Sequence, residues 1–157
     1  MNDLAEILFL IDTAYDRASW HGPNLRGSLR GVTPRQAAWR PGASRHNIWE
    51  LVVHAAYWKY VAWRRLTGAK RGSFALDGSN WLPRTGGSAR ALRADVDLLD
   101  TIHRTLREAV ARLDPAALDR RPQKGTATTR ALVTGIAAHD LYHAGQIQLL
   151  KKLGGTR

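Results

Sequence analysis

Four segments of the chain carry apolar residues at alternating steps of three and four, the spacing that gives a helix one apolar face. These segments span residues 4–20, 44–67, 88–114 and 128–152. In the first of them, Leu4, Leu8, Ile11 and Tyr15 follow this spacing. No segment shows the strict apolar and polar alternation that is typical of a half-buried strand. The sequence therefore predicts an all-α protein.

Residues that favour helix ends flank these segments. Serine and threonine begin helices well because the hydroxyl accepts a hydrogen bond from a backbone amide of the first turn, and glycine readily ends them. On this basis we expect helix starts at Ser44, Ser88 and Thr128 or Thr129, and a helix end at Gly68. Thr33 and Pro34 predict one further short helical turn.

Four amphipathic helices bury their apolar faces best as a bundle. The connections of residues 21–42 and 69–87 are longer than adjacent antiparallel helices need, so we expect long crossover connections. A chain of 157 residues is long enough to bury its own core. We therefore expect residues 1–157 to form a single four-helix bundle domain.

The amino-acid composition limits the metal ligands and the binding partners that the chain can have. The chain has no cysteine, which excludes disulfides and thiolate sites and leaves histidine and carboxylate as the strong metal ligands. The formal net charge of +11 favours anionic partners. The arginines are nevertheless scattered, with no run of five or six like charges and no basic stretch interleaved with aromatic residues. We therefore interpret the charge mainly as that of a solvated, arginine-rich surface. As partner we expect a small-molecule substrate, which the charge would favour as an acidic one, rather than a nucleic acid.

The start of the chain lacks the basic region and cleavage site of a signal peptide, and its short apolar run from Ile7 to Ile11 is stopped by Asp12. No apolar stretch is long enough to span a bilayer. These features predict a cytoplasmic protein with no membrane partner.

His139 and His143 are the strongest candidates for metal binding. They lie four residues apart in the last predicted helix, so both rings project from one face and can chelate a single ion. Ile136 and Ile147 continue the same line, which places the pair on the buried face. The metalloprotease pattern needs glutamate after the first histidine, and Asp140 stands there instead. Taken alone, the pair also fits two histidines that are hydrogen-bonded in a core.

His54 supplies a third imidazole, on an apolar turn between Val53 and Ala55. A lone histidine in such a place is more often a satisfied core residue than a ligand. Three histidines on two inward helix faces, however, provide the ligand set of a catalytic zinc or nickel site with one open position. We therefore predict a divalent ion, zinc or nickel, on His54, His139 and His143.

The other histidines are weaker candidates. His46 is expected to be exposed in the first turn of the second helix, without a role. His103 is in register with an apolar stripe and is a candidate for a fourth ligand or a supporting group. Ile102 can carry the packing of that turn, however, so we favour a boundary position for His103. His21 follows Trp20 at a helix end and is placed over the mouth of the bundle.

The chain resembles the DinB/YfiT-like superfamily of DNA-damage-inducible proteins, many of them thought to be metalloenzymes. The resemblance covers nearly the whole chain and is carried by residues 20–23 (WHGP), 46–54 (HNIWELVVH), 65–68 (RLTG) and 139–147 (HDLYHAGQI). The last stretch is the most specific, because a Tyr-His-x-Gly-Gln-Ile run that closes a pair of histidines is hard to reach by chance.

The resemblance implies a four-helix bundle of unusual connectivity, often dimeric, with a divalent metal on one histidine of the second helix and two of the fourth. By position these are His54, His139 and His143, the residues already selected. Some relatives are transferases or isomerases that use mycothiol, bacillithiol or glutathione. We therefore also expect a homodimer. The family name indicates a stress response but not DNA binding.

Our leading hypothesis is a transferase in which the ion lowers the pKa of a low-molecular-weight thiol. A hydrolase that uses water activated by the metal is one alternative, and a non-catalytic metal-binding stress protein is another. No catalytic residue is assigned.

Two sets of residues are candidates to complete the site. Arg40 and Arg84, together with Trp39 and Trp81, lie in the long connections and are candidates to cover it. Glu50 and Gln146 are candidates to hold the imidazole rings in place.

Overall fold

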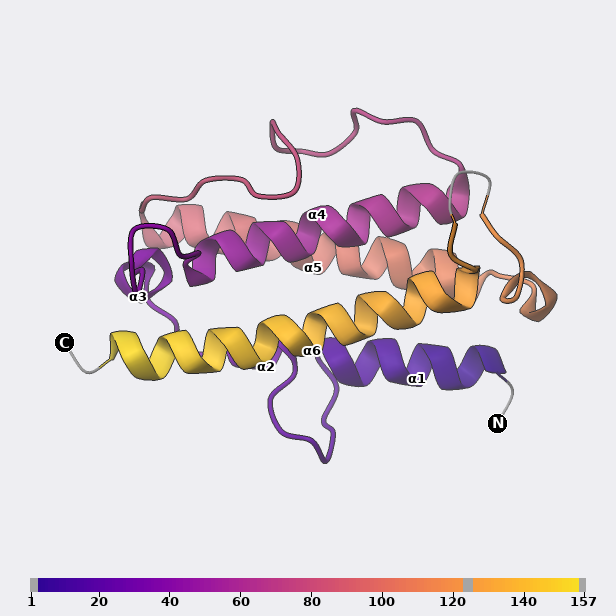
Figure 1. Cartoon of the computed structure of the whole chain (residues 1–157), viewed down its shortest axis with the longest axis horizontal. Coiled ribbons are helices and arrows are strands. Elements are labelled where there is room, and N and C mark those ends of the chain that lie inside the picture. The colour runs from indigo at the N-terminus through magenta and orange to yellow at the C-terminus, as the bar shows by residue number, and fades with distance from the viewer. Residues whose placement is uncertain (1–2, 123–125, 156–157) are drawn as a thin grey trace.

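The computed structural model describes residues 3–122 and 126–155, so the outermost residues of the predicted domain lie outside it. This part of the chain contains six α-helices and one 3-10 helix, and no strand (Figure 1). The elements are α1 (Asp3–Tyr15), α2 (Leu25–Ser28), α3 (Pro34–Ala38), α4 (Ile48–Thr67), α5 (Ala89–Ala111), η1 (Pro115–Ala117) and α6 (Thr129–Gly154). The all-α prediction is confirmed. Within the described residues, no helix combines the length and the apolar run needed to cross a bilayer.

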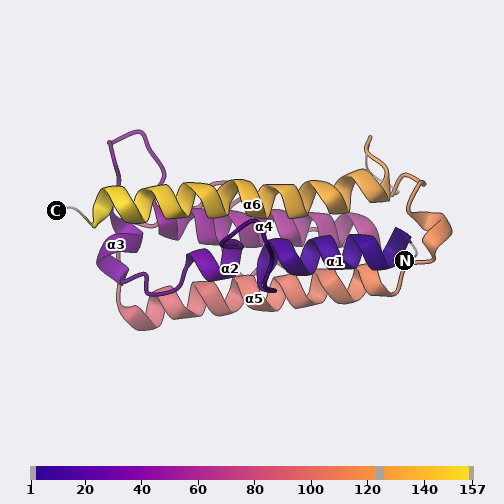
Figure 2. The ribbon, with the colours of Figure 1, turned by 90° about the horizontal axis from the view of Figure 1, so that it is seen from below.

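The four long helices form a ring in cross-section. Helix α4 packs against α5 and α6, and α1 packs against the same two helices. Helix α1 therefore lies diagonally opposite α4, and α5 lies opposite α6 (Figure 2). Residues 68–88 return along the bundle before α5 begins, so that α4 and α5 run in the same direction (Figure 1). The predicted crossover connections are confirmed.

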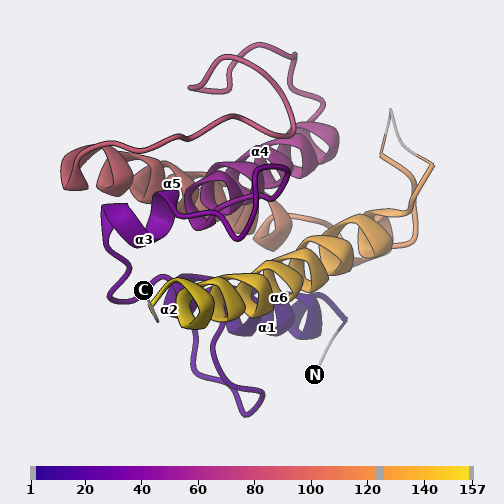
Figure 3. The same cartoon turned by 60° about the vertical axis from the view of Figure 1, so that its left-hand side comes forward.

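Helix α1 is the shortest of these four, and two small helices lie beyond its end. Helix α2 packs on α6, and α3 packs on α4 and α5 (Figure 3). Thr33 begins α3 with a capping box that includes Gln36, as the predicted helical turn requires. Ser88 and Thr128 begin α5 and α6, which confirms both predicted starts.

Helix α4 begins after Asn47 and not after the predicted Ser44. The Asn47 side-chain oxygen accepts a hydrogen bond from the Glu50 amide at 2.8 Å. Its amide group donates to the carbonyls of Ala38 and Arg84. Ser44 is exposed in a turn. Asn47 begins the helix in place of Ser44 because its buried side chain forms hydrogen bonds with the first turn of α4 and with both neighbouring connections. The end of α4 at Gly68, with a left-handed φ of 72°, is as predicted.

Helix α1 ends at Tyr15, before the predicted Trp20. Just beyond it, the Arg17 amide bonds to the Asp12 carbonyl, and the Asn24 side chain donates to the Arg17 carbonyl at 2.7 Å. These bonds replace the next turn of helix and direct the chain into α2. Trp20 consequently lies exposed in the loop.

The core consists of two apolar clusters, one that includes Trp49 and Leu99 and another that includes Ile11 and Leu106. Buried polar side chains of α4, α5 and α6 lie between the residues that each of these helices contributes to the two clusters. They are Lys59, His103 and Asp140, and the Tyr15 ring of α1 belongs to the first cluster.

Lys59 and Asp140 form a fully buried ion pair in this layer. The Lys59 Nζ lies 2.5 Å from Asp140 Oδ2, and each side chain is 1% exposed. The same Nζ lies 4.8 Å from the centre of the Tyr15 ring. Burial raises the pKa of Asp140 to about 6, against the opposing effect of Lys59. The pair joins α4 to α6 in the middle of the bundle.

Removal of one charge should be far more harmful than removal of both. We expect Lys59→Met to lower the free energy of unfolding by about 3–5 kcal/mol, because Asp140 is left buried without a partner. The double variant Lys59→Met/Asp140→Leu should recover most of this loss. Chemical denaturation of the three proteins measures the effect. A double variant no more stable than the single one would contradict this explanation.

Candidate metal centre

Three histidine side chains from α4 and α6 meet in the bundle. His139 Nε2 lies 3.2 Å from His54 Nε2 and 3.0 Å from His143 Nε2. One nitrogen from each ring lies within 4.8 Å of the other two. His54 and His143 are buried, and His139 is half-buried. The structure thus brings together the three predicted ligands, and in the described part of the chain no second such group of histidine or acidic residues is found.

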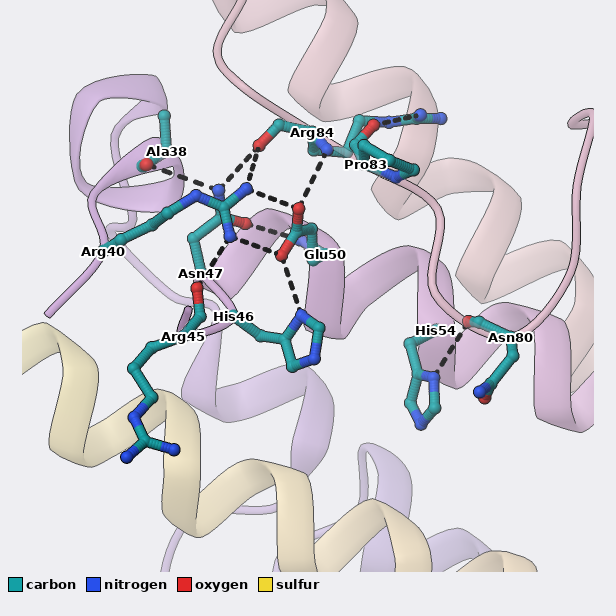
Figure 4. Close-up of polar contacts among 10 residues, drawn as sticks. All are labelled: Ala38, Arg40, Arg45, His46, Asn47, Glu50, His54, Asn80, Pro83 and Arg84. Atoms are coloured by element: carbon teal, nitrogen blue, oxygen red, sulfur yellow. Dashed lines mark hydrogen bonds and ion pairs between the residues drawn. The ribbon is translucent and has the colours of Figure 1, made fainter. Parts of the chain in front are cut away.

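The outer nitrogens of two rings are held by hydrogen bonds. His54 Nδ1 lies 2.9 Å from the backbone carbonyl oxygen of Asn80 (Figure 4). His143 Nδ1 lies 2.6 Å from Gln146 Oε1, so Gln146 holds this ring as predicted. A carbonyl oxygen only accepts, so each Nδ1 carries the proton. The Nε2 atoms of both rings therefore present lone pairs to His139.

The three Nε2 atoms share too few protons for both of their short contacts to be hydrogen bonds. A neutral His139 can donate from Nε2 to only one of its two neighbours, so one lone pair always faces another nitrogen. A bound cation would remove that repulsion. The Nε2 separations of 3.0 and 3.2 Å also approach the distance of about 3.3 Å between nitrogens in a tetrahedral zinc site. The donor set fits a divalent ion.

The three imidazoles are uncharged at neutral pH. Burial lowers the pKa of His54 to about 4 and that of His139 to about 3, and neighbouring histidines add to both effects. Burial also lowers the pKa of His143 below its usual range. Neutral rings offer their lone pairs to a metal without first losing a proton.

The segment before α5 covers one side of the group. The indole of Trp81 stacks on His54 with 3.7 Å between ring centroids, and on His46 with 3.5 Å. Both contacts are nearly parallel, so Trp81 lies between the two imidazoles. Asn80, whose φ is 59°, accepts a hydrogen bond on its side chain from Trp58 at 2.9 Å. Trp81 therefore covers the site as predicted, whereas Trp39 lies against Gly154 in the last turn of α6.

Comparison with known families agrees with this geometry. The model of the DinB superfamily matches residues 17–147, which include all three histidines. The chain belongs to the DinB superfamily. No curated protein and no solved structure matched the chain. The family assignment made from the sequence motifs is confirmed.

In this DinB protein, Glu50 supports the site by a route that the sequence did not indicate. Its carboxylate accepts two hydrogen bonds from the Arg40 guanidinium, one from the Arg84 amide, and it contacts His46 Nδ1 at 3.0 Å (Figure 4). Burial alone would raise the pKa of Glu50, but these bonds hold it at about 2. Glu50 was a candidate to hold one of the three imidazoles, but the structure gives it His46 as its imidazole contact, whereas His54 Nδ1 faces the Asn80 carbonyl.

His46 therefore has a structural role that the sequence analysis did not assign. It is exposed, as predicted, but it precedes α4 instead of lying in its first turn. Glu50 holds its ring against the outer face of Trp81, whose inner face covers His54. His21 is exposed in the loop after α1 and is not a member of the histidine group.

His103 is buried, at 3% exposure, and Ile102 is half-buried, so the predicted boundary position of His103 is wrong. Its ring stacks on Tyr15 with 3.6 Å between centroids, and it is not a member of the histidine group. The Nδ1 atom has no hydrogen-bond partner among the described residues. Burial, with Lys59 and Arg107 nearby, lowers the pKa of His103 to about 2. His103 is a core residue of this DinB protein.

The metal prediction can be tested by elemental analysis of protein purified without a polyhistidine tag. We expect a stoichiometric divalent ion that is lost in His143→Ala. His21→Ala is the matched control, because it removes an exposed imidazole outside the group and should retain the ion. Gln146→Leu should bind the ion roughly 10–100-fold more weakly, since it loses only the bond that orients His143. Equal metal content in wild type and His143→Ala would refute the assignment.

The burial of His103 should also make the free energy of unfolding depend on pH. The folded protein keeps this ring neutral, whereas the unfolded chain takes up a proton below its ordinary pKa of 6.5. Stability is therefore lost as the pH falls below 6.5, by up to about 1.4 kcal/mol per pH unit from this residue.

His103→Phe keeps a ring to stack on Tyr15 but cannot be protonated, so its stability should fall less steeply with acidification. Its metal content should equal that of wild type. Denaturation at a series of pH values, with elemental analysis, tests both statements. Parallel pH profiles would show that His103 is not the group responsible.

Proposed function

We propose that this DinB protein is a metal-dependent transferase that uses a low-molecular-weight thiol. The observation that carries the proposal is the convergence of three uncharged imidazoles, which no further protein donor joins among the residues that the structure describes. Structural zinc sites usually have four protein ligands, whereas catalytic sites have three and an open position. A zinc or nickel ion on His54, His139 and His143 would act as a Lewis acid that lowers the pKa of a bound thiol.

The residues of the chain would orient and shield this centre. Asn80 and Gln146 keep the Nδ1 protons of His54 and His143 in place, so both Nε2 atoms stay available. Trp81 excludes water from one face of His54. Because the chain has no cysteine, the sulfur must come from a separate molecule. The net charge of +11 favours an anionic one.

The test is whether turnover needs a thiol. Metal-loaded protein should convert an electrophilic substrate, such as an epoxide, only with bacillithiol, mycothiol or glutathione, and mass spectrometry should detect the thioether product. His143→Ala should reduce the rate to background, whereas His21→Ala, an exposed histidine outside the group, should not. Full-rate conversion without thiol would refute the transferase and indicate a hydrolase. A large loss of thermal stability on chelation, without any turnover, would indicate a non-catalytic protein.

A further inference from the structure

A cavity of about 480 Å³ lies beside the histidine group, between the segment that precedes α4 and the second half of α6. This volume is typical of sites for small molecules. Its walls are largely apolar and include Leu51, Trp81, Leu149 and Leu150. His143 also lines the cavity, so a ligand inside it would lie next to the metal centre.

Two arginines expected to cover the site are already neutralised. Arg40 forms an ion pair with Glu50, and Arg84 forms one with Asp95. Arg45 differs from both. It lines the cavity, and its guanidinium has no ion pair or hydrogen bond with any residue of the described ranges. Figure 4 shows its side chain directed toward α6 and away from Glu50.

The backbone of Arg45 is held by hydrogen bonds, whereas its guanidinium has no partner among the described residues. Arg40 Nη1 donates to the Arg45 carbonyl at 2.7 Å, and the Arg45 amide donates to Gly42 at 3.0 Å. Arg40 thus links Arg45 to Glu50 at the start of α4. The anchor of the cation is fixed before any ligand arrives, which lowers the entropy lost on binding.

We propose that this cavity binds a small apolar carboxylate, such as an aryl acid that carries an epoxide, with its carboxylate on Arg45. A guanidinium donates two parallel hydrogen bonds to a carboxylate, and one free arginine matches one negative charge. Leu51, Leu149 and Leu150 bury the apolar part. The inference rests on the proposed function, because the acid would carry the electrophilic carbon to which the thiol is added, and phenylacetate is its unreactive analogue.

Calorimetric titration with phenylacetate and its neutral analogue phenylacetamide tests the proposal on the full, metal-loaded chain. Wild type should bind the acid at least about tenfold more tightly than the amide, which corresponds to about 1.4 kcal/mol. Arg45→Gln should lose this preference and keep its affinity for the amide. Arg35→Gln, which changes an exposed arginine of α3 outside the cavity, should keep the preference.

Equal affinity of wild type for acid and amide, binding of neither, or an unchanged preference in Arg45→Gln would each overturn the proposal. Metal content measured on the same samples separates it from the proposed function. Preference for the acid in protein that holds no metal would support the cavity and refute the metal-dependent activity. Bound metal without that preference would leave the metal centre intact and refute the carboxylate site.

Discussion

The buried ion pair between Lys59 and Asp140 determines how α4 faces α6. Neither charge has access to water, so each depends on the other for compensation. A slip of one helix by a single turn, about 5.4 Å, would separate them. Lys59 follows His54 along α4, and Asp140 is adjacent to His139 in α6. The register that joins the two charges is therefore also the register that brings the imidazoles together.

Burial alone does not explain the histidine group. His103 is as deeply buried as His54 and His143, and its pKa is also lowered by desolvation. Its ring nevertheless packs flat on one neighbour, whereas His54, His139 and His143 direct nitrogens at one another. A core can accommodate one neutral imidazole by stacking. Three converging ring nitrogens leave one lone pair facing another nitrogen unless a cation is present, and this distinguishes a ligand set from a packed histidine.

The features of the site that depend on local geometry could be predicted from sequence. The spacing of His139 and His143 fixes their relation within one helix, and the apolar surroundings of His54 place it inward. Family motifs indicated the same three residues. Pairings between distant segments could not be predicted, because Lys59 lies in a helix rich in aromatic and charged residues and nothing local links it to Asp140. The start of α4 could not be predicted for the same reason. Asn47 and Ser44 can both begin a helix, and only the contacts of Asn47 with Ala38 and Arg84 decide between them.

The crossover between α4 and α5 has a consequence for the site. Because these helices are parallel, their connection must return along the bundle (Figure 1). On this path its residue Asn80 lies against His54 of α4 (Figure 4). Three contacts follow from this path: the Asn80 carbonyl on His54, the Trp81 ring on the same imidazole, and the Arg84 amide on Glu50. A short antiparallel hairpin between the same two helices would leave His54 Nδ1 without an acceptor, and its Nε2 would then no longer be held free of a proton. The long connection is thus a structural part of the metal centre, and the parallel order of the helices is what places it there.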